Sequence, residues 1–320
     1  MLHAHFSEGD YMTESLLNAK YLGGMVGSAI GDVMGELAFQ YRDRNMLIAA
    51  AERMAELRYT DDTAMAIGLA TSLVNKGHVE GHHLGETFHR NFEKEPWRGY
   101  ATGPPIIFSL VRSKEITYVD AAQMLFGGSG SFGNGAAMRV VPLGLLFHNS
   151  RQIYEFACKS AEVTHGHPIG KDGAAVQALA VAQAVRLDST ETFRPEDFVR
   201  YLIDFARTSE IREKLELLKE LLNEDVPPPM VAKQLGQSVA VHESLPFAIY
   251  SFLRFPSSFE DCLYCAIMHG GDRDTLGAMA GAISGAYLGF EAIPLLWRTK
   301  LENREKIERL ALELARKTVS

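Results

Sequence analysis

Two ladders of glycine residues constrain the fold of this chain more than any other feature. In each ladder a glycine stands at every fourth position: Gly23, Gly27, Gly31 and Gly35 in the first, and Gly277, Gly281, Gly285 and Gly289 in the second. Residues four apart lie on one face of an α-helix. Because glycine destabilises a helix by about 1 kcal/mol relative to alanine, we expect a compensating contact. The pattern therefore predicts two helices that pack closely at the centre of the molecule.

The rest of the chain also has a helical pattern. No run of alternating β-branched residues bounded by turns indicates a strand. Long helices are predicted over residues 16–36, 61–76, 171–186 and 209–224, followed by an amphipathic C-terminal helix. We therefore predict an all-α fold, with an N-terminal extension over residues 1–15 and a single compact multi-helix domain over residues 16–320.

Composition and charge exclude several classes of protein. A net charge of -8 in 320 residues argues against bulk nucleic-acid binding, which usually leaves a basic surface. The first ten residues lack the basic and apolar regions of a signal peptide. The most apolar stretch, residues 276–290, is too short to span a bilayer. We expect a cytoplasmic protein without a membrane or nucleic-acid partner, and we predict a monomer.

Two short acidic segments each open a predicted helix. They read Thr60-Asp61-Asp62-Thr63 and Asp272-Arg273-Asp274-Thr275. Taken alone, each pair of aspartates is best explained by helix capping and compensation of the helix dipole. Two such sets, each on a helix rich in small residues, favour a shared metal site instead. Oxygen-only ligands suit Mg²⁺, Mn²⁺ or Ca²⁺ rather than zinc.

A glycine-rich segment over residues 127–135 lies between the two acidic segments. It satisfies G-x-G-x-x-G, but the preceding residues 119–126 look helical, and no Lys-Ser/Thr follows, so neither named phosphate motif applies. Backbone N–H groups of such a loop can still bind phosphate, helped by Ser129 and Ser131. His165 could touch a substrate hydroxyl or phosphate, although a structural role is the default for a lone histidine.

Five motifs in order along the chain resemble the ADP-ribosylhydrolases, also called the dinitrogenase-reductase-activating glycohydrolase family. They are Gly31-Asp-Val-Met-Gly35, Tyr59-Thr-Asp-Asp-Thr-Ala-Met65, Gly130-Ser-Phe-Gly-Asn-Gly-Ala-Ala-Met-Arg139, Val163-Thr-His165, and Gly270-Gly-Asp-Arg-Asp-Thr275 with the small-residue run that follows. Residues 98–100 and 241–250 are most similar to the branch that removes ADP-ribose from serine.

The resemblance implies an all-α fold with a central cleft that holds two Mg²⁺ ions, or Mn²⁺. The implied metal ligands are Thr60, Asp61 and Asp62 on one side and Asp272, Asp274 and Thr275 on the other. The metals would hold the 2″ and 3″ hydroxyls of the distal ribose. The implied substrate-binding residues are Gly130, Ser131, Phe132, Gly133 and Asn134, with His165 assisting.

The implied activity is hydrolysis at C1″ of ADP-ribose, which releases ADP-ribose from protein side chains or small conjugates, with serine favoured. Asp61 or Asp62 would position the attacking water. The serine branch carries a glutamate four residues after the glycine that matches Gly35, where this chain has Phe39. Glu36 is the nearby carboxylate and the third candidate for a catalytic role.

Three alternatives remain at this stage. The chain could act on arginine-linked ADP-ribose, or it could bind ADP-ribose without cleaving it, because the glutamate is displaced. It could also be a structural protein that retains only the fold. The four aspartates of the two acidic segments argue against the last alternative.

Overall fold

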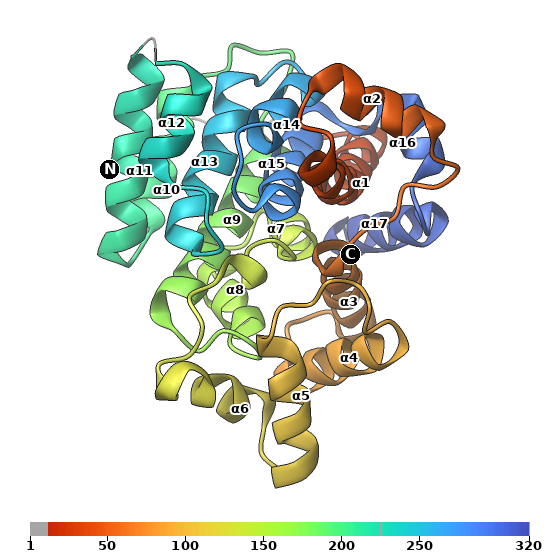
Figure 1. Cartoon of the computed structure of the whole chain (residues 1–320), viewed down its shortest axis with the longest axis vertical. Helices are drawn as coiled ribbons and strands as arrows, with labels where there is room; N and C mark the ends of the chain where they lie inside the picture. The colour runs from red at the N-terminus through yellow and green to blue at the C-terminus, as the bar shows by residue number, and fades with distance from the viewer. Residues whose placement is uncertain (1–11, 225, 320) are drawn as a thin grey trace.

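The computed structural model describes residues 12–224 and 226–319, and these residues confirm the all-α prediction (Figure 1). They form seventeen α-helices and three short 3-10 helices, and no strand occurs among them beyond two isolated bridges. The α-helices are α1 (Glu14–Gln40), α2 (Arg44–Arg53), α3 (Asp61–Lys76), α4 (Gly81–Lys94), α5 (Gly103–Lys114), α6 (Tyr118–Met124), α7 (Val141–Leu146), α8 (Ile153–Ala161), α9 (Pro168–Arg186), α10 (Pro195–Phe205), α11 (Ser209–Asn223), α12 (Pro228–Leu235), α13 (Val241–Arg254), α14 (Phe259–Ile267), α15 (Arg273–Leu288), α16 (Leu295–Lys300) and α17 (Arg304–Val319). The 3-10 helices are η1 (Leu125–Gly128), η2 (Asn134–Ala136) and η3 (Phe290–Ala292).

The two glycine ladders meet at the centre of the molecule, as predicted. They lie on α1 and α15, which run antiparallel, since Gly23 faces Gly285 while Gly31 faces Gly277. A Cβ atom on Gly31 would overlap the carbonyl oxygen of Gly277, and a Cβ on Gly277 would overlap that of Gly31. The missing side chains therefore allow the two backbones to touch.

The last glycine of the second ladder has a different role. Gly289 lies just beyond α15 with φ 86°, where a side chain would be strained. At the other end of the contact, Gly35 packs against the backbone of Arg273 and Asp274. The C-terminal part of α1 is thereby fixed beside the start of α15, where the second acidic segment stands.

A buried lysine joins the ends of two central helices. Lys20 on α1 donates hydrogen bonds to the carbonyl oxygens of Leu187 (2.8 Å) and Tyr287 (3.0 Å), and more distantly to those of Ala184 and Ala286. These carbonyls lie at the C-terminal ends of α9 and α15. A cation there satisfies carbonyls that have no partner within the helix and complements both helix dipoles.

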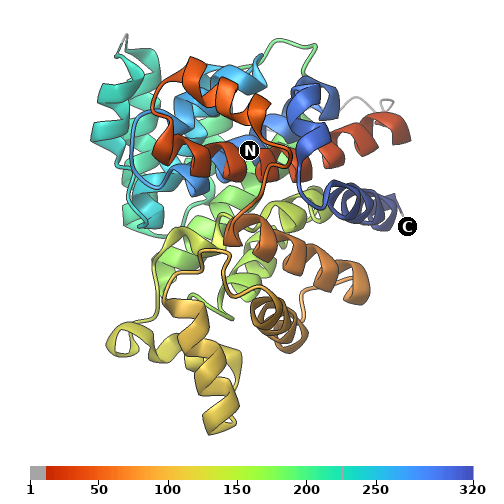
Figure 2. The same ribbon diagram turned by 45° about the vertical axis from the view of Figure 1, so that its right-hand side comes forward.

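The remaining helices pack around this centre. Helices α10 to α13 lie to one side of α1 and α15, while α3 to α6 extend to one end of the molecule in both views (Figures 1 and 2). The predicted extension over residues 1–15 lies mostly outside the described residues, and α1 already begins at Glu14. Of the helices that the structure describes, none is long and apolar enough to cross a membrane.

Candidate functional site

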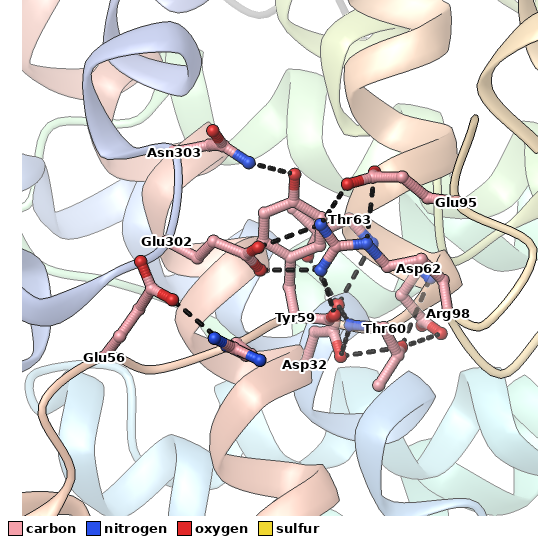
Figure 3. A network of polar contacts seen from close by, with 11 residues as sticks. Asp32, Glu56, Tyr59, Thr60, Asp62, Thr63, Glu95, Arg98, Glu302 and Asn303 are labelled. Atoms are coloured by element: carbon pink, nitrogen blue, oxygen red, sulfur yellow. Dashed lines mark hydrogen bonds and ion pairs between the residues drawn. The ribbon is translucent and has the colours of Figure 1, made fainter.

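The start of α3 is held by a carboxylate from another helix. Asp32 on α1 is fully buried and accepts hydrogen bonds from the backbone N–H and hydroxyl groups of both Thr60 and Thr63 (Figure 3). The shortest of these, from Thr63 Oγ1, is 2.6 Å. Asp32 therefore provides acceptors for backbone N–H groups at the start of α3. The sequence alone would assign this role to Asp61 or Asp62.

The first acidic pair is consequently free of a capping role. The side chain that caps α3 is Thr60, whose Oγ1 lies 3.4 Å from the backbone nitrogen of Asp62. Asp62 is buried, and its Oδ1 has no hydrogen-bond partner among the described residues. A buried carboxylate oxygen without a partner is costly, so this atom marks a place where a cation or a ligand donor would be favourable.

The second acidic pair begins α15. Asp272 occupies the N-cap position, yet its side chain makes no capping hydrogen bond. Its Oδ2 instead accepts from Asn134 Nδ2 at 2.7 Å, which ties the glycine-rich loop to the acidic segment. Asp274 Oδ1 accepts from the backbone N–H of Thr275 at 2.9 Å. Helix capping therefore does not account for Asp272.

Both acidic segments and the glycine-rich loop line one cavity of about 440 Å³. Ten predicted site residues line it, namely Asp61, Asp62, Ser131, Phe132, Gly133, Asn134, His165, Asp272, Asp274 and Thr275. Three do not, namely Glu36, Thr60 and Gly130. The Thr60 hydroxyl is bonded to Asp32, and Gly130, with φ 73°, packs against the backbone of residues 166 and 167.

The carboxylates in this cavity repel one another. Burial, followed by the charge of Asp32, raises the pKa of Asp61 to about 7. Burial and the charge of Asp274 raise the pKa of Asp62 well above its usual range. Burial, then Asp272, raises the pKa of Asp274 to about 8. So many negative groups in a buried site favour either protons or a bound cation.

Glu36 lies beside this cluster rather than in it. Its side chain is exposed on α1, although its charge contributes to the raised pKa of Asp274. Phe39, at the position of the family glutamate, is also exposed. Neither residue lines the cavity.

Another wall of the cavity is formed by the glycine-rich loop. The loop is fixed by backbone hydrogen bonds to residues 239–241: Asn134 N–H donates to Val239, and Phe132 accepts from Val241 N–H. Phe126 and Phe132 line the cavity with exposed rings. Phe126 has φ 51°, a strained backbone conformation for a bulky residue, which favours a functional explanation for its position.

A third wall comes from residues 99–104, which the sequence did not indicate as cavity-lining. This wall is anchored by Arg98, whose side chain is fully buried and forms ion pairs with Glu95 and Glu302 (Figure 3). Arg98 also donates to the carbonyl oxygen of Tyr59 at 2.9 Å and stacks over its ring. The wall is thereby held next to the first acidic segment.

Other cavity-lining residues that sequence reasoning missed include Phe126, Arg139 and Thr164, and it also missed the supporting Asp32. Asp32, Arg139 and Thr164 stand inside the matched motifs, so their motif membership was the available signal. Phe126 carried no such signal, because its backbone strain and exposure appear only in three dimensions.

Comparison with known proteins identifies the family of this chain. A profile of the ADP-ribosylglycohydrolase family matches residues 12–320. The chain belongs to the ADP-ribosylglycohydrolase family. It is a glycosyl hydrolase by this membership, and the prediction from five motifs is confirmed.

Individual relatives cover nearly the whole chain. ADP-ribosylhydrolase ARH3 of Homo sapiens is 33% identical over 93% of each chain, and its counterpart in Bos taurus is equally similar. The ADP-ribosyl-[dinitrogen reductase] glycohydrolase of Rhodospirillum rubrum is 27% identical over 93% of this chain and 95% of its own length. A solved ADP-ribosylglycohydrolase-related protein complex shares the fold, with a TM-score of 0.71 at 24% identity over 95% of this chain and 99% of that one.

Proposed function

We propose that this ADP-ribosylglycohydrolase is metal-dependent and releases ADP-ribose from modified serine side chains by hydrolysis at C1″. The observation that carries the proposal is that one cavity combines two kinds of lining. Carboxylates of both acidic segments line it together with the glycine-rich loop and two exposed aromatic rings. Such a lining matches a ligand that combines a ribose, a diphosphate and an aromatic base.

The acidic residues of the cavity offer the kind of ligand atoms that divalent cations prefer. Asp61, Asp62, Asp272, Asp274 and Thr275 offer only hard oxygen donors, and the partnerless Oδ1 of Asp62 adds an acceptor that a cation would satisfy. We propose that they hold two Mg²⁺ ions, with Mn²⁺ as a substitute, and that Thr60 joins them. In the described part of the chain, no group of three or more acidic, histidine or cysteine side chains is placed so that it could hold a metal ion as these side chains stand. Binding would therefore draw the carboxylates together.

The chemistry that bound Mg²⁺ would supply here is orientation of ribose hydroxyls and activation of water. The chain's own carboxylates would favour the positive charge that develops on the ribose in an oxocarbenium-like transition state. Asp61, whose pKa burial and Asp32 raise to about 7, is matched to accepting a proton from water near neutral pH. Asp62, deeper in the cavity, is the alternative residue for positioning that water.

The glycine-rich loop would bind the other half of the ligand. Ser131, Gly133 and Asn134 offer donors toward the diphosphate, and the rings of Phe126 and Phe132 offer faces on which a base can stack. Phe132 provides an aromatic face without the hydroxyl of the tyrosine that is frequent at this position of the family.

A second candidate function is binding of ADP-ribose without cleavage. It is favoured by one observation: the residue at the position of the family glutamate is Phe39, and the nearest alternative, Glu36, does not line the cavity. If Glu36 acts as a base, it would have to move toward the ligand. Loss of turnover in Glu36→Gln would support that role, whereas an unchanged kcat would assign the base to Asp61 or Asp62.

The deciding experiment compares peptides that carry ADP-ribose on serine with peptides that carry it on arginine, with Mg²⁺ or with EDTA. We expect release from the serine peptide with Mg²⁺ only. Release from arginine alone would contradict the serine assignment. Binding of ADP-ribose without release from either peptide would favour the second candidate.

Matched variants sharpen this assay. Asp274→Ala should abolish Mg²⁺-supported release, while Asp204→Ala, which removes an exposed carboxylate on α10, should leave it unchanged. Full activity of Asp274→Ala would contradict the two-metal proposal.

A further inference from the structure

Arg139 is an unusual residue for a protein interior. It is among the largest fully buried side chains, and it lines the cavity below the glycine-rich loop. A buried guanidinium must be matched by acceptors. The two terminal nitrogens of Arg139 find them in the carbonyl oxygens of Gly135 (3.1 Å) and Ser160 (3.2 Å) and in the hydroxyl of Thr164 (2.7 Å), whereas its Nε has no partner among the described residues. It also lies over the ring of Phe88.

The contact with Thr164 determines how that hydroxyl is used. A guanidinium has donors only, so the Thr164 oxygen must accept from Arg139. The hydroxyl proton of Thr164 then has two acceptors in reach: Nδ1 of His165 at 2.8 Å and the carbonyl oxygen of Ala161 at 3.4 Å. The nearer acceptor lies at the ordinary distance for a hydroxyl donor, and the further one lies beyond it. Donation to Nδ1 of His165 is therefore the better of the two hydrogen bonds open to this proton.

A histidine that accepts at Nδ1 carries its hydrogen on Nε2 when it is neutral. Nε2 of His165 makes no hydrogen bond within the described part of the chain, and the ring lines the cavity. A Cβ built on Gly135 would stand 3.2 Å from this nitrogen, so the absence of side chains at Gly133 and Gly135 leaves room beside it. The free N–H is accordingly presented to whatever occupies the cavity.

We infer that Arg139 and Thr164 are positioning residues that hold His165 in the Nε2–H tautomer, so that the ring is a fixed donor to an acceptor oxygen of the ligand. The inference rests on the proposed function for the ligand, since the diphosphate of an ADP-ribosyl group presents oxygens that only accept. The tautomer itself is a property of the free protein.

The first test is therefore made without ligand or metal. Protein labelled with ¹⁵N-histidine shows for each ring which nitrogen carries hydrogen, and His165→Gln identifies the signals of His165 among the eleven histidines. We expect a neutral ring with hydrogen on Nε2 only in the wild type. Hydrogen on Nδ1 would overturn the inference whatever the protein catalyses.

The second test measures binding of ADP-ribose to variants of Thr164. Thr164→Val removes the hydroxyl at nearly constant volume, and we expect about tenfold weaker binding, as for loss of one well-placed hydrogen bond. Thr164→Ser retains the hydroxyl and should restore both the single tautomer and the affinity. Thr87→Val, which removes another buried hydroxyl outside the cavity, should leave binding unchanged.

The outcomes of the two tests separate the two proposals. If the wild type binds no ADP-ribose, the proposed function fails. The tautomer of His165 in the free protein then still shows whether Arg139 and Thr164 position this ring. If a folded Thr164→Val variant keeps the single Nε2–H tautomer and wild-type affinity, Thr164 has no positioning role. Thermal melting of each variant, compared with Thr164→Ser, shows whether lost binding reflects lost folding.

Discussion

At the scale of single residues, the site is a set of buried polar groups whose partners come from distant parts of the chain. Asp32 serves the start of α3, Asn134 holds Asp272, and Thr164 links Arg139 to His165. Two buried atoms of the cavity residues have no partner among the described residues, namely Oδ1 of Asp62 and Nε of Arg139. Buried groups that are not satisfied destabilise a fold unless a ligand satisfies them.

The first residue-scale prediction concerns Asp62. Asp62→Asn removes one of the charges that repel each other in the cavity, so in EDTA we expect the free energy of unfolding to rise by about 1–2 kcal/mol. Mg²⁺ should raise the melting temperature of the wild type and not that of the variant. Differential scanning fluorimetry with and without Mg²⁺ measures both effects. Asp204→Asn, on the surface, should behave like the wild type in both conditions.

The second residue-scale prediction concerns pH. Burial, followed by the charge of Arg139, lowers the pKa of His165 from 6.5 to about 3. Between these two values the unfolded chain binds a proton that the folded chain does not, so this residue's contribution to stability falls as pH falls through that window. Asp61 and Asp274 have raised pKa values and act in the opposite direction. The contribution of His165 to the pH dependence of stability must therefore be measured as the difference between the wild type and a variant that lacks this histidine.

We expect His165→Gln to lose this acid sensitivity. Below pH 6.5 the unfolding free energy of this variant should fall less steeply with decreasing pH than that of the wild type. The two slopes should differ by up to about 1.4 kcal/mol per pH unit, which is the value for one bound proton. Urea unfolding of both proteins from pH 4.5 to pH 7.5 measures the two slopes. Parallel curves would show that His165 is protonated in the folded state.

At the scale of helices, the molecule is organised by the contact between α1 and α15. The antiparallel register carries Gly35 to the start of α15, and Asp32 on the same helix bonds to the start of α3. Both acidic segments thereby begin their helices beside the same part of α1. The ladder pattern predicted a close helix pair, and the register of that pair is what brings the site together.

The element-scale prediction is a glycine substitution in this contact. In Gly27→Ala the new methyl group would overlap the carbonyl oxygen of Gly281, which belongs to a helix backbone and has no room to turn away. We expect the unfolding free energy to fall by about 3 kcal/mol, at the upper end for overpacking. Gly81→Ala, whose Cβ would meet only Val163 at 3.7 Å, should change it by less than about 0.5 kcal/mol. Chemical unfolding of the two variants gives the comparison, and equal stabilities would show that α1 and α15 have space to separate.

At the scale of the whole molecule, Arg98 connects parts of the chain that are far apart in sequence. It bonds to Glu302, 204 positions away, and to the carbonyl oxygen of Tyr59, next to the first acidic segment (Figure 3). The connection joins the C-terminal helices to two walls of the cavity. Stability and ligand binding should therefore change together when it is broken.

Arg98→Met tests that coupling. The change leaves Glu302 without its partner and releases residues 99–104, so we expect about 3–5 kcal/mol lower stability and weaker binding of ADP-ribose. Arg98→Lys should recover only part of both, because lysine lacks the planar fork that pairs with two carboxylates. The control is Arg200→Met, which breaks an exposed pair with Asp197 and should cost less than about 1 kcal/mol. Urea unfolding measures the stability, and calorimetric titration measures the affinity for ADP-ribose. If Arg98→Met binds ADP-ribose as strongly as the wild type, the anchoring of residues 99–104 by Arg98 does not affect binding.

Much of this arrangement was predictable from local patterns. Periodic apolar residues gave the all-α fold and the principal helices: residues 61–76 match α3, and 209–224 match α11 within one residue. The glycine ladders predicted the central pair. The family motifs indicated the aspartates of the two acidic segments and the glycine-rich loop as site residues. Glu36, Thr60 and Gly130 were expected in the site but do not line the cavity, because their orientations depend on neighbours in other helices.

By itself, the sequence determined the helices, the close central pair, the family and ten residues that line the cavity. Helix periods and motifs are local, and a chain carries them without reference to its folded shape. Only the tertiary structure decided that Asp32 supports the start of α3, that Phe126 lines the cavity in a strained conformation, and that Thr164 lies between Arg139 and His165. The hydrogen bonds of Asp32 and Arg139 join segments that are separated in the sequence, and such contacts form only when the helices have packed.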